Sequence, residues 1–179
     1  WRMLATQKLV SPFEAPFDGG GRTFSGYPEA RQQLLDLLLQ PAIGSTVVLS
    51  GDAHLTIAAD LLADPGDPSL PDNPYQPGTG KGAVAPEFMG ASITRGNVDE
   101  TLGDAPPEFY QELTNTFLAT NPHFAYTNLT DHGYGLLDVT TERTIAELHT
   151  VPILQWSQQG KFAGGVQANH GDRYWQRGV

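Results

Sequence analysis

The segment Val47–Leu55 reads VVLSGDAHL and constrains the fold more than any other stretch of the chain. Its apolar run predicts a short buried strand over residues 46–49, which is terminated by Ser-Gly. Asp52 and His54 follow just past the carboxyl end of that strand, where ligands and catalytic groups collect in open α/β sheets. Because side chains two apart on an extended segment point the same way, we expect both residues to face one pocket.

The surrounding pattern predicts a layered α/β fold. Residues 28–40 (PEARQQLLDLLLQ) form a helix with proline in its first turn and a wide apolar face, and Pro41 stops it. A helix followed by a buried strand is typical of a helix packed on a sheet. Residues 55–64 fit either a strand or a short helix. The other expected elements are strands over 1–10 and 84–92, a helix over 107–119, and an antiparallel hairpin that ends near residue 151.

The domain organisation is expected to be simple. Residues 1–151 read as one unit, and residues 152–179 as a tail, rich in glycine and with little pattern, that packs on it. Residues 64–82 form a long loop dense in proline and glycine, and Leu70 and Tyr75 within it offer apolar side chains that suit a membrane surface or the pinning of the loop.

The composition excludes several classes of function. The 179 residues carry a formal net charge of −10, which repels nucleic-acid phosphate and argues against nucleic-acid binding. The chain has no cysteine, so disulfides are excluded. No apolar run is long enough for a transmembrane helix. Few lysines among many Gly, Pro, Thr and Asn fit an extracellular protein, and we expect secretion.

The chemistry of Asp52 and His54 allows two interpretations. A carboxylate suits calcium, magnesium or manganese, whereas an imidazole suits iron or zinc, so the pair predicts a metal site. Alternatively, Asp52 caps the next element and His54 is an ordinary polar residue. Gly-Asp-x-His alone favours this second interpretation.

Several segments in order change that balance. They read WRMLATQKLVSP, SGYPEARQQLL, VVLSGDAH, PEFMGASIT, NPHFAY and HGYGLLDVT. Together they resemble the C-terminal part of PhoD-like metallophosphatases, the alkaline phosphatase D and phosphodiesterase family. The resemblance spans most of residues 1–151. It implies the C-terminal half of a calcineurin-like sandwich, with mixed sheets flanked by helices and a two-metal centre. Ser25 departs from the aspartate that the family has before Gly-Tyr-Pro.

The resemblance also implies a ligand set. Asp52 would bind calcium and His54 would bind iron, with zinc or manganese possible in place of either. The family's other ligands lie in N-terminal motifs that this sequence lacks, and Gly171–Tyr174 resembles one of them only superficially. We therefore expect the chain, which starts at Trp1 in a strand-like pattern, to be a C-terminal piece that works with an N-terminal fragment of the same precursor.

Other polar residues are weaker candidates. His123 is a candidate catalytic acid, or else a structural loop residue bonded to backbone. Asn121 and Arg95 are candidate substrate-binding residues. For Arg95 the reason is that an arginine at the end of a strand suits a phosphate group. Arg31 lies on the predicted helix and is expected to anchor it by a salt bridge rather than to bind substrate. His132 is expected at the surface, and His149 in a strand, packed or half exposed.

The resemblance leads to a function with alternatives. We expect a secreted phosphodiesterase of phospholipase D type that cleaves the head group from phospholipids, as in the actinomycete enzymes of the family. The alternatives are a broad alkaline phosphomonoesterase, a phosphodiesterase for nucleotides or teichoic acid, and a non-catalytic module in which Asp52 holds one calcium ion.

Overall fold

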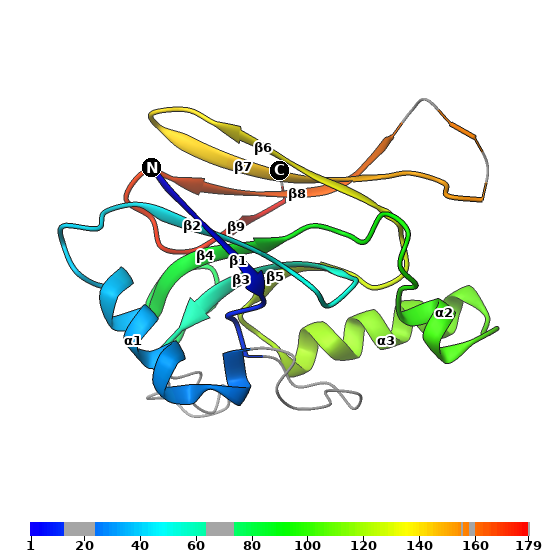
Figure 1. Cartoon of the computed structure of the whole chain (residues 1–179), viewed down its shortest axis with the longest axis horizontal. Coiled ribbons are helices and arrows are strands. Elements are labelled where there is room, and N and C mark those ends of the chain that lie inside the picture. Colours follow the sequence, from blue (N-terminus) through cyan, green and yellow to red (C-terminus); the bar gives the residue numbers. More distant parts are fainter. Residues whose placement is uncertain (13–23, 64–73, 155, 158–159, 179) are drawn as a thin grey trace.

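The computed structural model describes residues 1–12, 24–63, 74–154, 156–157 and 160–178. Two sheets pack face to face, with helices on the outer face of the larger one (Figure 1). The strands are β1 (Arg2–Lys8), β2 (Thr46–Gly51), β3 (Thr56–Leu62), β4 (Ala83–Met89), β5 (Phe124–Asn128), β6 (Gly133–Val139), β7 (Arg143–Thr150), β8 (Lys161–Asn169) and β9 (Gln176–Arg177). The helices are α1 (Pro28–Leu38), α2 (Val98–Leu102) and α3 (Pro107–Thr120), preceded by a short 3-10 turn, η1 (Phe24–Gly26).

The larger sheet is mixed, and its topology creates one chemically rich edge. Its strand order is β1-β2-β4-β3-β5. Strands β1 and β4 run parallel to β2, whereas β3 runs antiparallel to both β4 and β5. The carboxyl ends of β1, β2, β4 and β5 therefore meet the start of β3 along one edge, which we call the site edge.

The smaller sheet is antiparallel, in the order β6-β7-β8-β9, and covers the inner face of the larger one. Between the sheets lie Val47, Phe88, Ala146, Val166 and Trp175, among others. The opposite face of the larger sheet is covered by α1 and α3 through the leucines of α1 and Phe117 of α3. This arrangement confirms the predicted layered fold. No described helix is long and apolar enough to cross a membrane.

The strand–helix ambiguity at residues 55–64 is resolved as strand β3, which is buried along its whole length. Strands covered on both faces read as continuous apolar runs, so this segment shows no alternation. The predicted helices, the strand over 46–49 and the hairpin β6–β7 are all present.

The expectation of a patternless tail after residue 151 is wrong, because β8 and β9 complete the smaller sheet. Glycines made β8 read as a loop, yet they serve its packing. A Cβ at Gly164 would lie 2.6 Å from the ring of Tyr126, so only glycine lets the two sheets approach there.

A buried polar cluster ties the helix layer to the sheet. The carboxylate of Glu87 on β4 accepts hydrogen bonds from the backbone N–H groups of Val10 (2.8 Å) and Ser11 (2.7 Å). Arg31 on α1 donates to the carbonyls of Val10 (2.9 Å) and Leu62 (2.6 Å). Arg31 anchors α1 as predicted, but it does so through two carbonyl groups, and the expected salt bridge is not among the ion pairs of the described residues.

The long loop has a structural role where it is described. Tyr75 is buried and donates from its hydroxyl to Asp60 of β3 (2.8 Å). Of the two interpretations for Tyr75, the pinning of the loop is confirmed and contact with a membrane is wrong. Leu70 lies outside the described residues.

Candidate metal centre

The connection between β2 and β3 is unusually strained. It comprises residues 52–55 and crosses the end of β4, which lies between β2 and β3 in the sheet. Asp52 (φ 78°) and His54 (φ 57°) both adopt the left-handed backbone region. Residues other than glycine enter this region at a cost, and such positions cluster at functional sites.

This geometry corrects the expectation of a shared pocket. The segment is not extended, so the rule for side chains two apart does not apply. Asp52 contacts Lys8 at the end of β1, with 2.8 Å between Lys8 Nζ and Asp52 Oδ2. His54 instead lines a cavity beside α2. The two candidate ligands therefore reach different surroundings along the site edge.

Lys8 is a site residue that the sequence did not reveal. Its side chain and that of Asp52 are each 35% exposed, so their ion pair contributes little to stability. Lys8 reaches Asp52 because β1 pairs in parallel with β2, and Lys8 aligns with Gly51. The motif Gly-Asp-x-His carries no trace of that long-range pairing.

One residue that lines the cavity beside His54, Asn97, has a buried side-chain oxygen without a partner among the described residues. The cavity has a volume of about 200 Å³, and its lining includes His54, Asn97, Leu55 and Leu102. Asn97 is 2% exposed and donates from Nδ2 to the carbonyl of Thr130 (3.0 Å). Its Oδ1 has no hydrogen-bond partner among the residues that the structure describes. An unpaired buried acceptor costs about 1–3 kcal/mol.

Helix α2, which forms one wall of this cavity, is fixed by His132. His132 Nε2 lies 2.7 Å from Glu100 Oε1 of α2, and its Nδ1 lies 3.2 Å from the carbonyl oxygen of Ser92. The expectation of a surface position is wrong, since His132 is buried. The predicted strand position of His149, on β7, is confirmed.

Arg95 belongs to the site edge by position. It lies in the connection from β4 to α2, directly before Gly96, which lines the His54 cavity. Its side chain is exposed, and its backbone N–H is bonded to the hydroxyl of Ser92 (2.9 Å). The structure thus brings Asp52, His54 and Arg95 to one edge.

His123 and Asn121 lie at the opposite end of the sheet, and their predicted roles at the centre are corrected by this placement. The His123 carbonyl accepts from the N–H of Asp60, which lies four residues along β3 from Thr56 and hence roughly 13 Å from the start of that strand at the site edge. His123 Nε2 lies 2.7 Å from the Pro12 carbonyl oxygen, and burial lowers the pKa of its imidazole to about 4. Asn121 is buried and donates to the Phe117 carbonyl (2.9 Å). Both stabilise the end of α3 and its surroundings.

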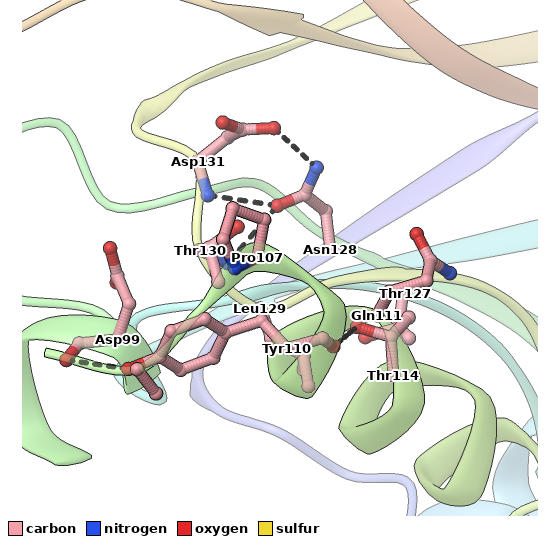
Figure 2. Close-up of a pocket in the computed structure, with 11 residues that line it drawn as sticks. Asp99, Pro107, Tyr110, Gln111, Thr114, Thr127, Asn128, Leu129, Thr130 and Asp131 are labelled. Carbon is pink, nitrogen blue, oxygen red and sulfur yellow. Dashed lines mark hydrogen bonds between the residues drawn. The ribbon is translucent and has the colours of Figure 1, made fainter. Parts of the chain in front are cut away.

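A larger cavity of about 470 Å³ lies between α3 and the end of β5 (Figure 2). The described lining contains Asp99 and Asp131 and no lysine or arginine. Asn128 makes two hydrogen bonds with Asp131. Its Nδ2 donates to the Asp131 carboxylate (2.8 Å), and its Oδ1 accepts from the Asp131 backbone N–H (2.9 Å). Carboxylates without a cation disfavour a phosphate group, so the site edge near Asp52, His54 and Arg95 suits phosphate better.

The side chains at the site edge are of the types that bind metal ions, but the described residues supply too few of them for a complete metal site. Asp52 offers a carboxylate oxygen and His54 an imidazole nitrogen, on a turn held in a costly backbone conformation. Among the described residues there is no group of three or more His, Cys, Asp or Glu side chains placed to hold a metal ion. Two ligands from this chain need further ligands from elsewhere.

Comparison with known proteins decides the family. The family model described as "PhoD-like phosphatase" matches residues 1–148. The chain belongs to the PhoD-like phosphatase family. Alkaline phosphatase D of Bacillus subtilis (strain 168) is 27% identical over 134 residues, which cover 74% of this chain and 19% of that protein. The chain thus spans about a fifth of the length of this curated PhoD-like relative.

A solved structure supports the fold over nearly the whole chain. The structure titled "Structure of PhoD" superposes with a TM-score of 0.65 at 20% identity, over 98% of this chain and 31% of that one. The match extends beyond residue 148, so the PhoD-like fold includes the strands β8 and β9. The family resemblance and the fold class drawn from the sequence are both confirmed.

Proposed function

We propose that this chain carries part of the active centre of a metal-dependent phosphoric ester hydrolase. The observation that carries the proposal is the turn after β2, which holds Asp52 and His54 in the left-handed region at the site edge. A strained turn with two ligand-type side chains, in a member of a phosphatase family, is better explained by a site than by packing.

The two side chains suit two different metals. Asp52 would hold an oxygen-preferring ion, which we propose to be calcium, and His54 would hold iron, with zinc or manganese as substitutes. Their separate surroundings, at Lys8 and at the α2 cavity, support two positions rather than one. The metals would supply charge neutralisation at phosphorus and a water activated for attack.

The chain's own residues have definable tasks. The turn after β2 preorganises the two proposed ligands, because its backbone conformation is fixed before a metal binds. Arg95, exposed at the same edge, would bind a phosphate oxygen through its planar guanidinium group.

The remaining ligands are proposed to come from an N-terminal portion of the same precursor. The support is the shortage of ligands among the described residues, together with the small share of its PhoD-like relatives that this chain covers. A structural metal site in a protein usually has four ligands, and even a catalytic site has three from the protein.

We propose a phosphodiester substrate, a phospholipid cleaved by a secreted enzyme of phospholipase D type. The support is the resemblance to the secreted actinomycete enzymes of the family, together with a composition low in lysine and high in alanine and glycine. A second candidate, an alkaline phosphomonoesterase, is favoured by the name of the Bacillus relative. A third, a calcium-binding accessory module, is favoured by the incomplete ligand set.

Turnover of natively purified protein separates these candidates. The substrates are a soluble monoester, a soluble diester and phosphatidylcholine. We expect faster turnover of the diesters, whereas a clear monoester preference would select the second candidate. With the soluble diester, His54→Ala should lose about 100-fold or more in activity, a loss typical of a metal-site residue. His149→Ala, on the smaller sheet, is the matched control. Equal activity of both variants would support the accessory module.

A further inference from the structure

The connection between β7 and β8 exposes large apolar side chains. We call residues 151–154 and 156–157, the part of this connection that the structure describes next to β7, the β7–β8 tip; they carry no charge, in a chain with a net charge of −10. Leu154 is 95% exposed and Trp156 is 84% exposed, and Ile153 is also exposed. Exposed aromatic rings of Tyr134 and Phe162 lie on the strands at the base of the tip.

The tip starts at the site edge. The N–H of Val151 donates to the carbonyl of His132 (2.9 Å), and the N–H of Gly133 donates to the carbonyl of Ser92 (3.1 Å). Ser92 follows β4 and begins the connection that lines the His54 cavity. In Figure 1 the segment that follows β7 leaves the smaller sheet at the end of the sandwich where α2 lies.

The shape and chemistry of the tip favour a lipid surface over a protein partner. Two long side chains at the end of a hairpin give a small footprint, whereas a stable protein interface needs about 800 Å² on each side. Interfacial binding to lipid grows with the apolar area that is inserted, and tryptophan and tyrosine are the residues enriched at that interface. Because the chain is acidic, an anionic surface would repel it, and an uncharged tip fits a zwitterionic surface.

We propose that the β7–β8 tip binds a zwitterionic phospholipid surface by inserting Leu154 and Trp156, and so brings the site edge to the lipid head groups. The binding step is independent of catalysis; its consequence, access to a lipid substrate, rests on the function proposed above.

The test is binding of the natively purified protein, with any N-terminal portion that remains bound to it, to phosphatidylcholine vesicles, measured by co-sedimentation. Leu154→Glu and Trp156→Glu should each weaken partitioning by about tenfold or more, because each places a charge where an apolar group inserts. The control is Leu37→Glu, which alters an exposed leucine on α1 and should change partitioning less than about twofold. Tryptophan fluorescence should shift to the blue on vesicle addition, and Trp156→Phe should abolish the shift.

Several outcomes would overturn the proposal: no vesicle binding by the unaltered chain, equal binding by the tip variants, or binding only when phosphatidylserine is added. If the unaltered protein is dimeric on gel filtration and the Trp156→Glu variant is monomeric, the tip would instead be assigned as a contact with a second copy. His54→Ala should bind vesicles like the unaltered chain. If the catalytic proposal fails, the vesicle-binding result is unaffected. If vesicle binding fails, the proposal for the tip is overturned and the proposal for the metal centre is unaffected.

Discussion

Replacing Asp60 with asparagine should make the stability of the protein less sensitive to pH. Asp60 lies on β3 and is buried, where its Oδ1 accepts from the backbone N–H of Trp175 (2.8 Å) and its Oδ2 accepts from the Tyr75 hydroxyl (2.8 Å). Burial raises the pKa of this carboxyl from 3.8 to about 6, against the opposing effects of the two hydrogen bonds and of the charge on Arg177.

The sign and magnitude follow from linkage. With a raised pKa, the folded state holds the Asp60 proton more tightly than the unfolded state does. The stabilisation is therefore complete below pH 3.8 and is lost as pH rises through about 6. At 1.36 kcal/mol per pH unit, the full loss is about 3 kcal/mol, of which about 2–3 kcal/mol falls between pH 4 and pH 8.

The assay is urea unfolding of the unaltered chain and of Asp60→Asn at pH 4 and pH 8. Asparagine can still accept from Trp175 and carries no ionisable proton. The stability of the variant relative to the unaltered chain should therefore rise by about 2–3 kcal/mol from pH 4 to pH 8. Asp36→Asn, an exposed position on α1, is the control and should show little change. A relative stability of Asp60→Asn that is the same at both pH values would refute the reasoning.

Three further predictions address the buried contacts. Arg31→Met removes both donors to the Val10 and Leu62 carbonyls and should lower the free energy of unfolding by about 2–4 kcal/mol in urea; a loss under about 0.5 kcal/mol would contradict the anchoring role. Trp175→Phe deletes the indole N–H that donates to the Glu87 carbonyl (2.9 Å) and should cost about 1–2 kcal/mol, against about 3–5 kcal/mol for Trp175→Ala, measured by thermal unfolding. The imidazole of His123 should titrate near pH 4 by NMR, because burial lowers its pKa, and a midpoint above 6 would be at odds with its placement.

The local parts of the fold were predictable because their signals are local. Pro28 and the apolar face define α1, and the run before Ser50-Gly51 defines β2. The hairpin β6–β7 shows the alternation of a sheet with one exposed face. The sequence of β8 does not predict a strand, because Gly164 and Gly165 are typical of loops. In the structure Gly164 makes room for the ring of Tyr126 between the two sheets.

The candidate centre was only partly predictable, since a motif fixes residue types and not their neighbours. Asp52 and His54 could be chosen from Gly-Asp-x-His and its context. Their positive φ angles and the contact with Lys8 arise from the sheet topology, which no short motif encodes. The imidazole of His123 makes it a candidate acid from the sequence alone. Its distance from the turn after β2 depends on the antiparallel pairing of β5 with β3, which the sequence does not show.

Asn97 shows a signal that was available. Asparagine followed by Val-Asp-Glu is typical of a helix start, and α2 begins directly after it. That pattern predicts the helix, whereas the unpaired Oδ1 beside His54 is visible only in three dimensions.

The metal content of natively purified protein, measured by elemental mass spectrometry without chelator, tests the central claim most directly. We predict iron and calcium near one equivalent each, together with a second chain in equal amount that supplies the remaining ligands. We also predict that His54→Ala loses the iron and Asp52→Asn loses calcium, while His149→Ala retains both. Metal contents that are unchanged in His54→Ala and Asp52→Asn would contradict the assignment of the turn after β2 as a metal centre.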